Sequence, residues 1–292
     1  MAESIKSRAI ALYDRFTHEG MDRRDFMGEM TKLAGSVAAA NALIAAIAAS
    51  PAAAAIVPAD DPRLITKRGP LGKEEGALKG YIAVPRAATG KKIGSVIVIH
   101  ENRGLNAHIE DVARRVALAG FFAVAPDFLT PLGGTPANED QAREMIGKLN
   151  LGVSVASAVT LSERLRRLRH SNGKVGAIGF CWGGAFVNRL ATAAGDKLDA
   201  GVSFYGSAPD PSEASKVRAP LLLLLAELDQ RVNATALPWA EALRKSSHSV
   251  TSIIYPGVNH AFHNDTSAER YNKEAAERAW QTTVEFFRTQ LR

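Results

Sequence analysis

The feature that most constrains the fold of this chain is an alternation, beyond Pro58, of short apolar runs with segments of helical periodicity. Several of the runs are apolar on both faces, as strands are when helices cover a sheet from both sides. Strands that alternate with helices form βαβ units, which build a parallel sheet. We therefore expect an α/β fold with a mostly parallel central sheet and helices on both faces. The expected strands are Leu78–Val84, Ser95–His100, Phe121–Ala125, Val175–Gly179, Ala200–Tyr205, Leu221–Leu225 and Val250–Tyr255.

The segments between these strands fit the same fold. From Ile109 to Leu118, apolar residues recur at helical spacing, and Asp111, Arg114 and Arg115 are expected to face away from the core. The last segment carries an apolar stripe that is typical of a core-facing helix. Its members are Ala276, Trp280, Val284, Phe287 and Leu291.

The start of the chain has a different composition. Arg23 and Arg24, followed closely by apolar residues, resemble the arginine pair of a twin-arginine export signal, and residues 33–55 form an uncharged, alanine-rich stretch that ends in small residues. We expect residues 1–57 to be a leader for export to the periplasm, and residues 58–292 to form the functional domain. Alanine is only marginally apolar, so we expect no stable membrane anchor. The alternative is a helical extension that stays on a cytoplasmic protein.

Charge and cysteine content limit the function classes. The formal net charge of +6 is spread along the chain, and no nucleic-acid-binding motif occurs, so we expect no nucleic-acid partner. Cys181 is the single cysteine, which excludes an intrachain disulfide. A lone cysteine is often only a small buried hydrophobic residue, so its neighbours must indicate whether it is reactive.

Those neighbours predict a nucleophile. Gly179 and Gly183 flank Cys181 at a distance of two residues, between a buried strand and a helical pattern that begins near Ala185. This is the G-x-nucleophile-x-G elbow with cysteine in place of serine. The glycines are needed because the tight turn brings the strand and helix backbones together. The helix N-terminus also favours the thiolate, which is the reactive form of cysteine.

Candidates for an acid and a base follow Cys181 in the order that is typical of such an elbow. Asp229 lies just past a buried strand, where sites form at the carboxyl edge of a sheet, and Glu227 is the alternative. His260 follows the last strand, and His263 is its alternative. His260 could accept the thiol proton through one ring nitrogen while Asp229 holds the other. The two histidines lack the partners of a zinc motif, so we expect no metal.

Three segments together resemble the dienelactone hydrolase family, the carboxymethylenebutenolidases, whose fold is the α/β-hydrolase fold. They are residues 100–106 with 109–115, residues 179–184, and residues 255–265 with Ala279 and Trp280. The similarity runs from about Leu78 to Phe287. The resemblance implies a triad of Cys181, Asp229 and His260. It also implies that Glu101 lies near the thiol and takes part in its activation when substrate binds.

The resemblance further implies an oxyanion hole and an anion-binding site. The oxyanion hole would use the backbone N–H groups of Asn102 and Trp182. Members of the family grip a substrate carboxylate with arginines, and Arg143 loosely matches one of these. Asn264 stands where the second arginine is expected, which makes dienelactone itself doubtful as the substrate.

We therefore predict a single α/β-hydrolase domain that cleaves a small-molecule ester or lactone through an acyl-thioenzyme at Cys181, with no metal and no organic cofactor. A thioester, a simple carboxylic ester or a peptide is the alternative acyl target. A non-catalytic α/β-hydrolase that binds a ligand is the alternative of another class. The complete set of cysteine, aspartate and histidine argues against it.

Overall fold

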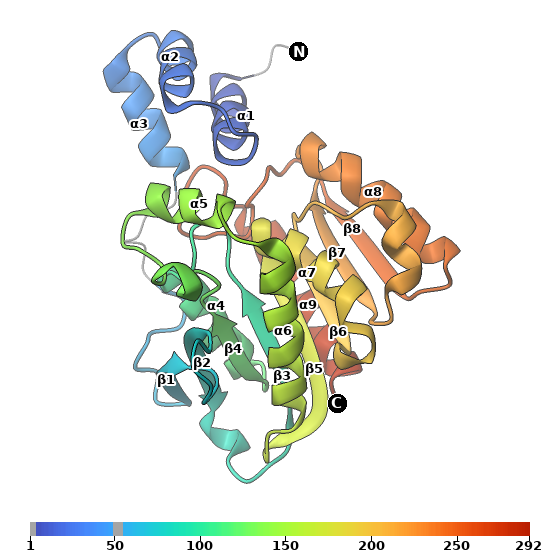
Figure 1. Ribbon diagram of the computed structural model, residues 1–292. Coiled ribbons are helices and arrows are strands. Elements are labelled where there is room, and N and C mark those ends of the chain that lie inside the picture. Colours follow the sequence, from blue (N-terminus) through green and yellow to red (C-terminus); the bar gives the residue numbers. More distant parts are fainter. Residues whose placement is uncertain (1–3, 49–54) are drawn as a thin grey trace.

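A computed structural model describes residues 4–48 and 55–292 (Figure 1). Its centre is an eight-stranded sheet in the order β1-β2-β4-β3-β5-β6-β7-β8. The six strands from β4 to β8 in this order run parallel, whereas β2 is antiparallel to both β1 and β4. The expected mostly parallel sheet is therefore confirmed. The strands are β1 (Leu64–Pro70), β2 (Lys79–Pro85), β3 (Ile93–Ile99), β4 (Phe122–Pro126), β5 (Ser171–Phe180), β6 (Ala200–Phe204), β7 (Leu221–Ala226) and β8 (Val250–Tyr255).

Helices cover both faces of this sheet, as expected. Side chains of α4 (Ala107–Leu118) and α9 (Lys273–Gln290) belong to the core on one face. Side chains of α6 (Leu151–Arg166), α7 (Trp182–Ala194) and α8 (Gln230–Lys245) belong to the core on the other. The remaining elements of this domain are α5 (Glu139–Gly147) and the short 3₁₀ turns Arg86–Ala88, Thr130–Leu132, Gly195–Lys197 and Pro211–Lys216.

Strand β3 shows why the central strands are apolar throughout. Val96 and Val98 are buried in one core, and Ile97 and Ile99 are buried in the other. Successive strand residues point to opposite faces, so a strand covered on both sides needs apolar residues at every position. Strand β1 is different: it lies at the edge and carries several exposed residues. It therefore has no such run, and the sequence pattern did not predict it.

The expectation that Asp111 and Arg114 face away from the core is wrong. Both side chains are buried, on the side of α4 that the chain entering the domain covers. The carboxylate of Asp111 accepts hydrogen bonds from the backbone N–H groups of Ile56 and Val57, at 3.1 and 2.8 Å. Arg114 Nε donates to the carbonyl of Val57 at 2.7 Å. These charged residues are buried because they bind backbone that would otherwise lack partners.

The N-terminal segment forms three helices, α1 (Ile5–His18), α2 (Arg23–Ala34) and α3 (Val37–Ile47), that pack around a core of their own. These three helices, which are blue in Figure 1, lie together above the sheet and next to α5. The arginine pair begins α2, and the alanine-rich stretch is broken at Gly35, whose φ of 83° ends that helix. The expected cleavage region at residues 52–55 lies almost entirely outside the described residues.

No single helix in the described ranges is both long and apolar enough to cross a membrane. Two pairs of consecutive helices reach that length and hydropathy only when they are joined, and α2 with α3, one of these pairs, is bent by 105° at the break.

Candidate active site

Cys181 stands at the turn between β5 and α7, in the strained backbone that a nucleophile elbow requires. Its φ is 55° and its ψ is −113°, and its N–H donates to the carbonyl of Phe204 at 3.0 Å. A Cβ on Gly179 would lie 2.0 Å from the carbonyl oxygen of Gly183, and a Cβ on Gly183 would lie 2.4 Å from that of Ile99. Both positions therefore admit only glycine, as the sequence pattern predicted.

Asp229 and His260 are in direct contact. Asp229 Oδ2 lies 2.5 Å from His260 Nδ1, and both side chains are buried. Asp229 Oδ1 accepts the N–H of Val232 at 3.1 Å, because Asp229 is also the N-cap of α8. The start of α8 thus holds the carboxylate in one orientation, and the carboxylate orients the imidazole ring.

The electrostatics couple His260 to Asp229 and Cys181. Burial alone lowers the pKa of His260, but the charges of Asp229 and Cys181, together with hydrogen bonds to both, outweigh it and raise that pKa to about 10. Burial raises the pKa of Asp229, but the charge of His260 and its hydrogen bond, together with Arg231 and the N–H of Val232, outweigh burial and lower that pKa. The arrangement therefore stabilises the protonated form of the His260 ring.

The two alternatives have other contacts. Glu227 Oε2 accepts the backbone N–H of Gly257 at 2.7 Å, which fastens the turn after β8. His263 is buried with its ring stacked on Phe180 at 5.1 Å, and burial lowers its pKa well below the usual value. Neither residue is among those that line the two cavities described below.

Glu101 lies beside the triad candidates in a small cavity. The cavity is lined by Glu101, Cys181 and His260, among others, and its volume is about 20 Å³. The side-chain amide of Asn264 donates to Glu101 Oε2 at 2.7 Å. Asn264, at the position of the expected arginine, therefore binds the carboxylate of Glu101. A polar cavity of this size has room for one water molecule.

A second cavity, of about 260 Å³, is also lined by Cys181. Asn102 and Trp182, whose backbone amides were expected to form the oxyanion hole, both line it, and so does Arg143. Trp182 is the first residue of α7, and the first N–H groups of a helix have no acceptor within the helix. Of the seven residues predicted for the site, six line these two adjoining cavities, and the seventh, Asp229, contacts His260.

The residues of the larger cavity that were not predicted include Arg231, Tyr205 and Thr17. Arg231 lines it, and its Nη1 donates to Ser207 Oγ at 3.2 Å; its place two residues after Asp229 was the available signal. Tyr205 follows β6 with a φ of 37°, and its hydroxyl is buried without a hydrogen-bond partner in the described part of the chain. Thr17 comes from α1, a helix that the sequence assigned to a leader.

Within residues 4–48 and 55–292, no three histidine, cysteine, aspartate or glutamate side chains gather in a way that could hold a metal ion.

Comparison with known proteins gives a consistent result. Residues 78–291 match the Dienelactone hydrolase family, and this match begins after α1–α3. A protein of Saccharolobus solfataricus named "Putative carboxymethylenebutenolidase" is 32% identical over 248 residues, which cover 72% of this chain and 93% of that protein. A protein of Methylorubrum extorquens with the same name is 30% identical and covers 83% of this chain and 88% of its own length.

The fold comparison agrees. The crystal structure of a "Putative Dienelactone Hydrolase" from Klebsiella pneumoniae superposes with a TM-score of 0.69 at 25% identity, and covers 77% of this chain and 98% of that one. A dienelactone hydrolase from Anabaena variabilis superposes with a TM-score of 0.62 at 23% identity, and covers 79% of this chain and 100% of its own; it supports the fold alone.

Proposed function

Because the chain belongs to the dienelactone hydrolase family, we propose that it cleaves a small carboxylic ester or lactone with Cys181 as the nucleophile. The family assignment makes it a hydrolase that acts on esters or lactones. The observation that carries the finer proposal is the joint geometry of three residues. His260 is bound to Asp229 at 2.5 Å, and His260 and Cys181 line one cavity at a nucleophile elbow.

In the first half of the reaction, the Cys181 thiolate attacks the carbonyl carbon of a substrate held in the larger cavity. The carbonyl oxygen becomes an oxyanion, which the N–H groups of Asn102 and Trp182 stabilise; one such donor typically contributes about 10²–10³ in rate. The C–O bond then breaks, and the alkoxide leaves with a proton from His260. An acyl group remains bound to sulfur as a thioester.

In the second half, the oxygen of a water molecule attacks the thioester carbonyl, the C–S bond breaks, and the carboxylic acid leaves while Cys181 returns to the thiolate. His260, now neutral, takes a proton from the water, and Asp229 stabilises the imidazolium that forms. The cavity of about 20 Å³ between Glu101, Cys181 and His260 is large enough for this water. Glu101, held by Asn264, also lies where it can take part in activating the thiol when substrate binds.

The charges of the larger cavity favour an anionic group on the substrate. Arg143 and Arg231 both line it, and arginine binds carboxylates through paired N–H donors. Arg231 supplies a positive charge that Asn264 cannot supply. Ligand cavities typically have about 300–1,000 Å³, so one of about 260 Å³ suits a small ester or lactone.

The experiment compares wild type with Cys181→Ala and Cys181→Ser on p-nitrophenyl acetate, dienelactone and an acyl-thioester. We expect Cys181→Ala to lower kcat/KM by about 10³-fold or more on every substrate that the wild type cleaves. Cys181→Ser keeps the size of the side chain. If Cys181→Ser loses activity while its thermal unfolding curve is unchanged, the loss of activity in that variant is chemical and not a loss of folding. Wild-type rates in Cys181→Ala would refute the cysteine mechanism, and the ranking of the three substrates identifies the preferred acyl target.

A further inference from the structure

The N-terminal helix α1 forms a wall of the active site. Tyr13 and Thr17 line the small cavity together with Cys181 and His260, and Thr17 also lines the larger cavity. Thr17 therefore stands beside both spaces that adjoin the nucleophile. These helices precede the part of the chain that matches the family, so this wall is an addition to the family domain.

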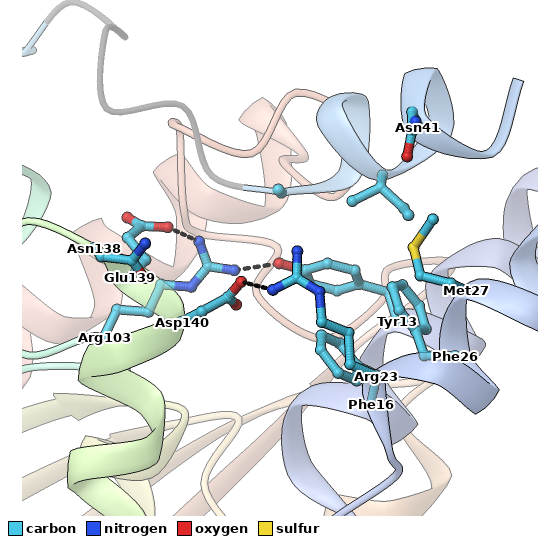
Figure 2. A pocket seen from close by; sticks show the side chains of 12 residues that line it. Tyr13, Phe16, Arg23, Phe26, Met27, Asn41, Arg103, Asn138, Glu139 and Asp140 are labelled. Atoms are coloured by element: carbon cyan, nitrogen blue, oxygen red, sulfur yellow. Dashed lines mark hydrogen bonds and ion pairs between the residues drawn. The ribbon is translucent and has the colours of Figure 1, made fainter. Parts of the chain in front are cut away.

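Arginines of the hydrolase domain hold α1 in this position. Arg103, next to the proposed oxyanion donor Asn102, donates to the hydroxyl of Tyr13 and to the carboxylate of Glu139 (Figure 2). The side-chain amide of Asn102 donates to the carbonyl of Thr17 at 3.3 Å. The oxyanion loop and α1 are thus fastened to each other.

Two more arginines make similar contacts. Arg143, in the larger cavity, lies over the ring of Phe16 at 4.1 Å from its centroid. Arg270 Nη1 lies 3.3 Å from a carboxylate oxygen of Asp14. Each of these contacts joins a residue of α1 to an arginine that lines one of the two cavities at Cys181. These contacts fix the position of α1 against the residues around Cys181, which favours a segment that stays on the working enzyme over one that is removed.

The three helices also have the stability signals of a folded unit. Each begins with a side-chain cap, at Ser4, Asp22 and Ser36. Phe16 and Phe26 stack at 4.2 Å inside their own core. Between this core and α5 lies a further cavity of about 280 Å³, at whose edge Arg23 pairs with Asp140 at 2.9 Å (Figure 2). Arg23 belongs to the arginine pair that resembles an export signal, and in this structure it joins α2 to the hydrolase domain.

We propose that α1–α3 are a retained cap of the working enzyme, and that Thr17 sets the size of the ester or lactone that reaches Cys181. This proposal rests on the proposed function, because it assumes that substrate binds beside Cys181. It favours the second interpretation of the N-terminal segment, an extension that stays on the protein, over a leader that is removed.

The test uses the full-length chain and a series of p-nitrophenyl esters from acetate to octanoate. Thr17→Leu adds bulk beside both cavities, and Thr17→Ala removes it; both replace a β-branched residue by a better helix former, so α1 is preserved. Ala11→Leu, on the exposed side of the same helix, is the matched control. The intact mass of each assayed protein establishes that the N-terminal residues are present.

We expect Thr17→Leu to lower kcat/KM for butyrate at least about tenfold more than for acetate, the order expected of a methylene-sized change in a pocket. Thr17→Ala should raise the ratio of butyrate to acetate rates, and Ala11→Leu should leave the profile unchanged. A chain-length profile that is the same in all four proteins would overturn the proposal. Failure of the proposed function would instead show as activity that survives in Cys181→Ala, so the two failures are distinguishable.

Discussion

Asp229 combines two roles that depend on different atoms of one carboxylate. Its Oδ1 caps α8 through the N–H of Val232, and its Oδ2 contacts His260. Asparagine is as good an N-cap as aspartate, but it carries no negative charge to stabilise an imidazolium. Asp229→Asn separates the two roles.

We expect Asp229→Asn to lower kcat by about 10²–10⁴-fold, the usual contribution of general acid–base catalysis, while the thermal unfolding temperature falls only slightly. Glu227→Gln is the control, because Glu227 binds the turn at Gly257 and should leave kcat unchanged. Steady-state kinetics on p-nitrophenyl acetate provide the measurement. Equal losses in the two variants would contradict the assignment of Asp229 as the partner of His260.

The raised pKa of His260 also predicts how stability depends on pH. The ordinary pKa of 6.5 applies to the unfolded chain, and the folded value is about 10. The folded state therefore binds the proton more tightly, and this stabilisation is fully present below pH 6.5 and is lost as pH rises to 10. Because Asp229 contributes to the raised pKa, Asp229→Asn should weaken this dependence. The difference in unfolding free energy between wild type and this variant should shrink from pH 6.5 to pH 10; a difference that stays constant would show that the ring is not charged in the folded protein.

At the scale of elements, the turn between β5 and α7 depends on close approach of backbones. A Cβ on Gly179 would meet the backbone of Gly183, which cannot move without displacing α7. Gly28, in α2, has no atom within 4 Å of such a Cβ. We expect Gly179→Ala to lower the free energy of unfolding by about 1–3 kcal/mol or more, the typical cost of overpacking. We expect Gly28→Ala to be neutral or to stabilise the protein by about 0.5–1 kcal/mol. Urea unfolding of both variants measures this, and equal stability would show that the elbow can relax.

The elements that the sequence predicted well are those with one dominant signal. The central strands are apolar on both faces, and all seven expected strands exist with bounds that differ by a few residues. Strand β1 escaped prediction because an edge strand needs no continuous apolar run. Asp111 and Arg114 of α4 looked solvent-exposed because charge usually indicates exposure, yet they bind the backbone of residues 56–57 in the interior.

The site shows the same division. Cys181, Asp229 and His260 were predictable because each follows a strong strand at one edge of the sheet. Arg231 and Tyr205 carry no motif, and only the folded chain shows that they line the same cavity. The place of Thr17 in the site could not be predicted from the sequence, because contacts between α1 and the loop at Asn102 connect residues 85 positions apart.

At the scale of the whole molecule, polar contacts join the cap to the hydrolase domain, whereas the core of the cap is separate from the two cores beside the sheet. Arg103 is the contact whose loss should matter most, because its side chain is only 11% exposed and binds both Tyr13 and Glu139. Hydrogen bonds of charged groups contribute about 1.5–3 kcal/mol, whereas exposed ion pairs contribute about 0–1 kcal/mol.

Arg103→Met should therefore raise the amide hydrogen-exchange rates of α1–α3 by about tenfold or more, with little change in the strands of the sheet. Arg23→Met removes an exposed pair with Asp140 and should have a much smaller effect. Hydrogen exchange followed by mass spectrometry resolves the two regions. Exchange that rises equally in cap and sheet would indicate that they unfold as one unit.

Covalent catalysis by Cys181 leaves an acyl-enzyme that can be trapped. Wild-type protein is mixed with p-nitrophenyl acetate, quenched in acid within the first turnover, digested and analysed by mass spectrometry. We expect one added acetyl group on the peptide that contains Cys181, and none in Cys181→Ala. An unmodified Cys181 peptide from fully active enzyme, or an acetyl group on another side chain, would contradict covalent catalysis by Cys181.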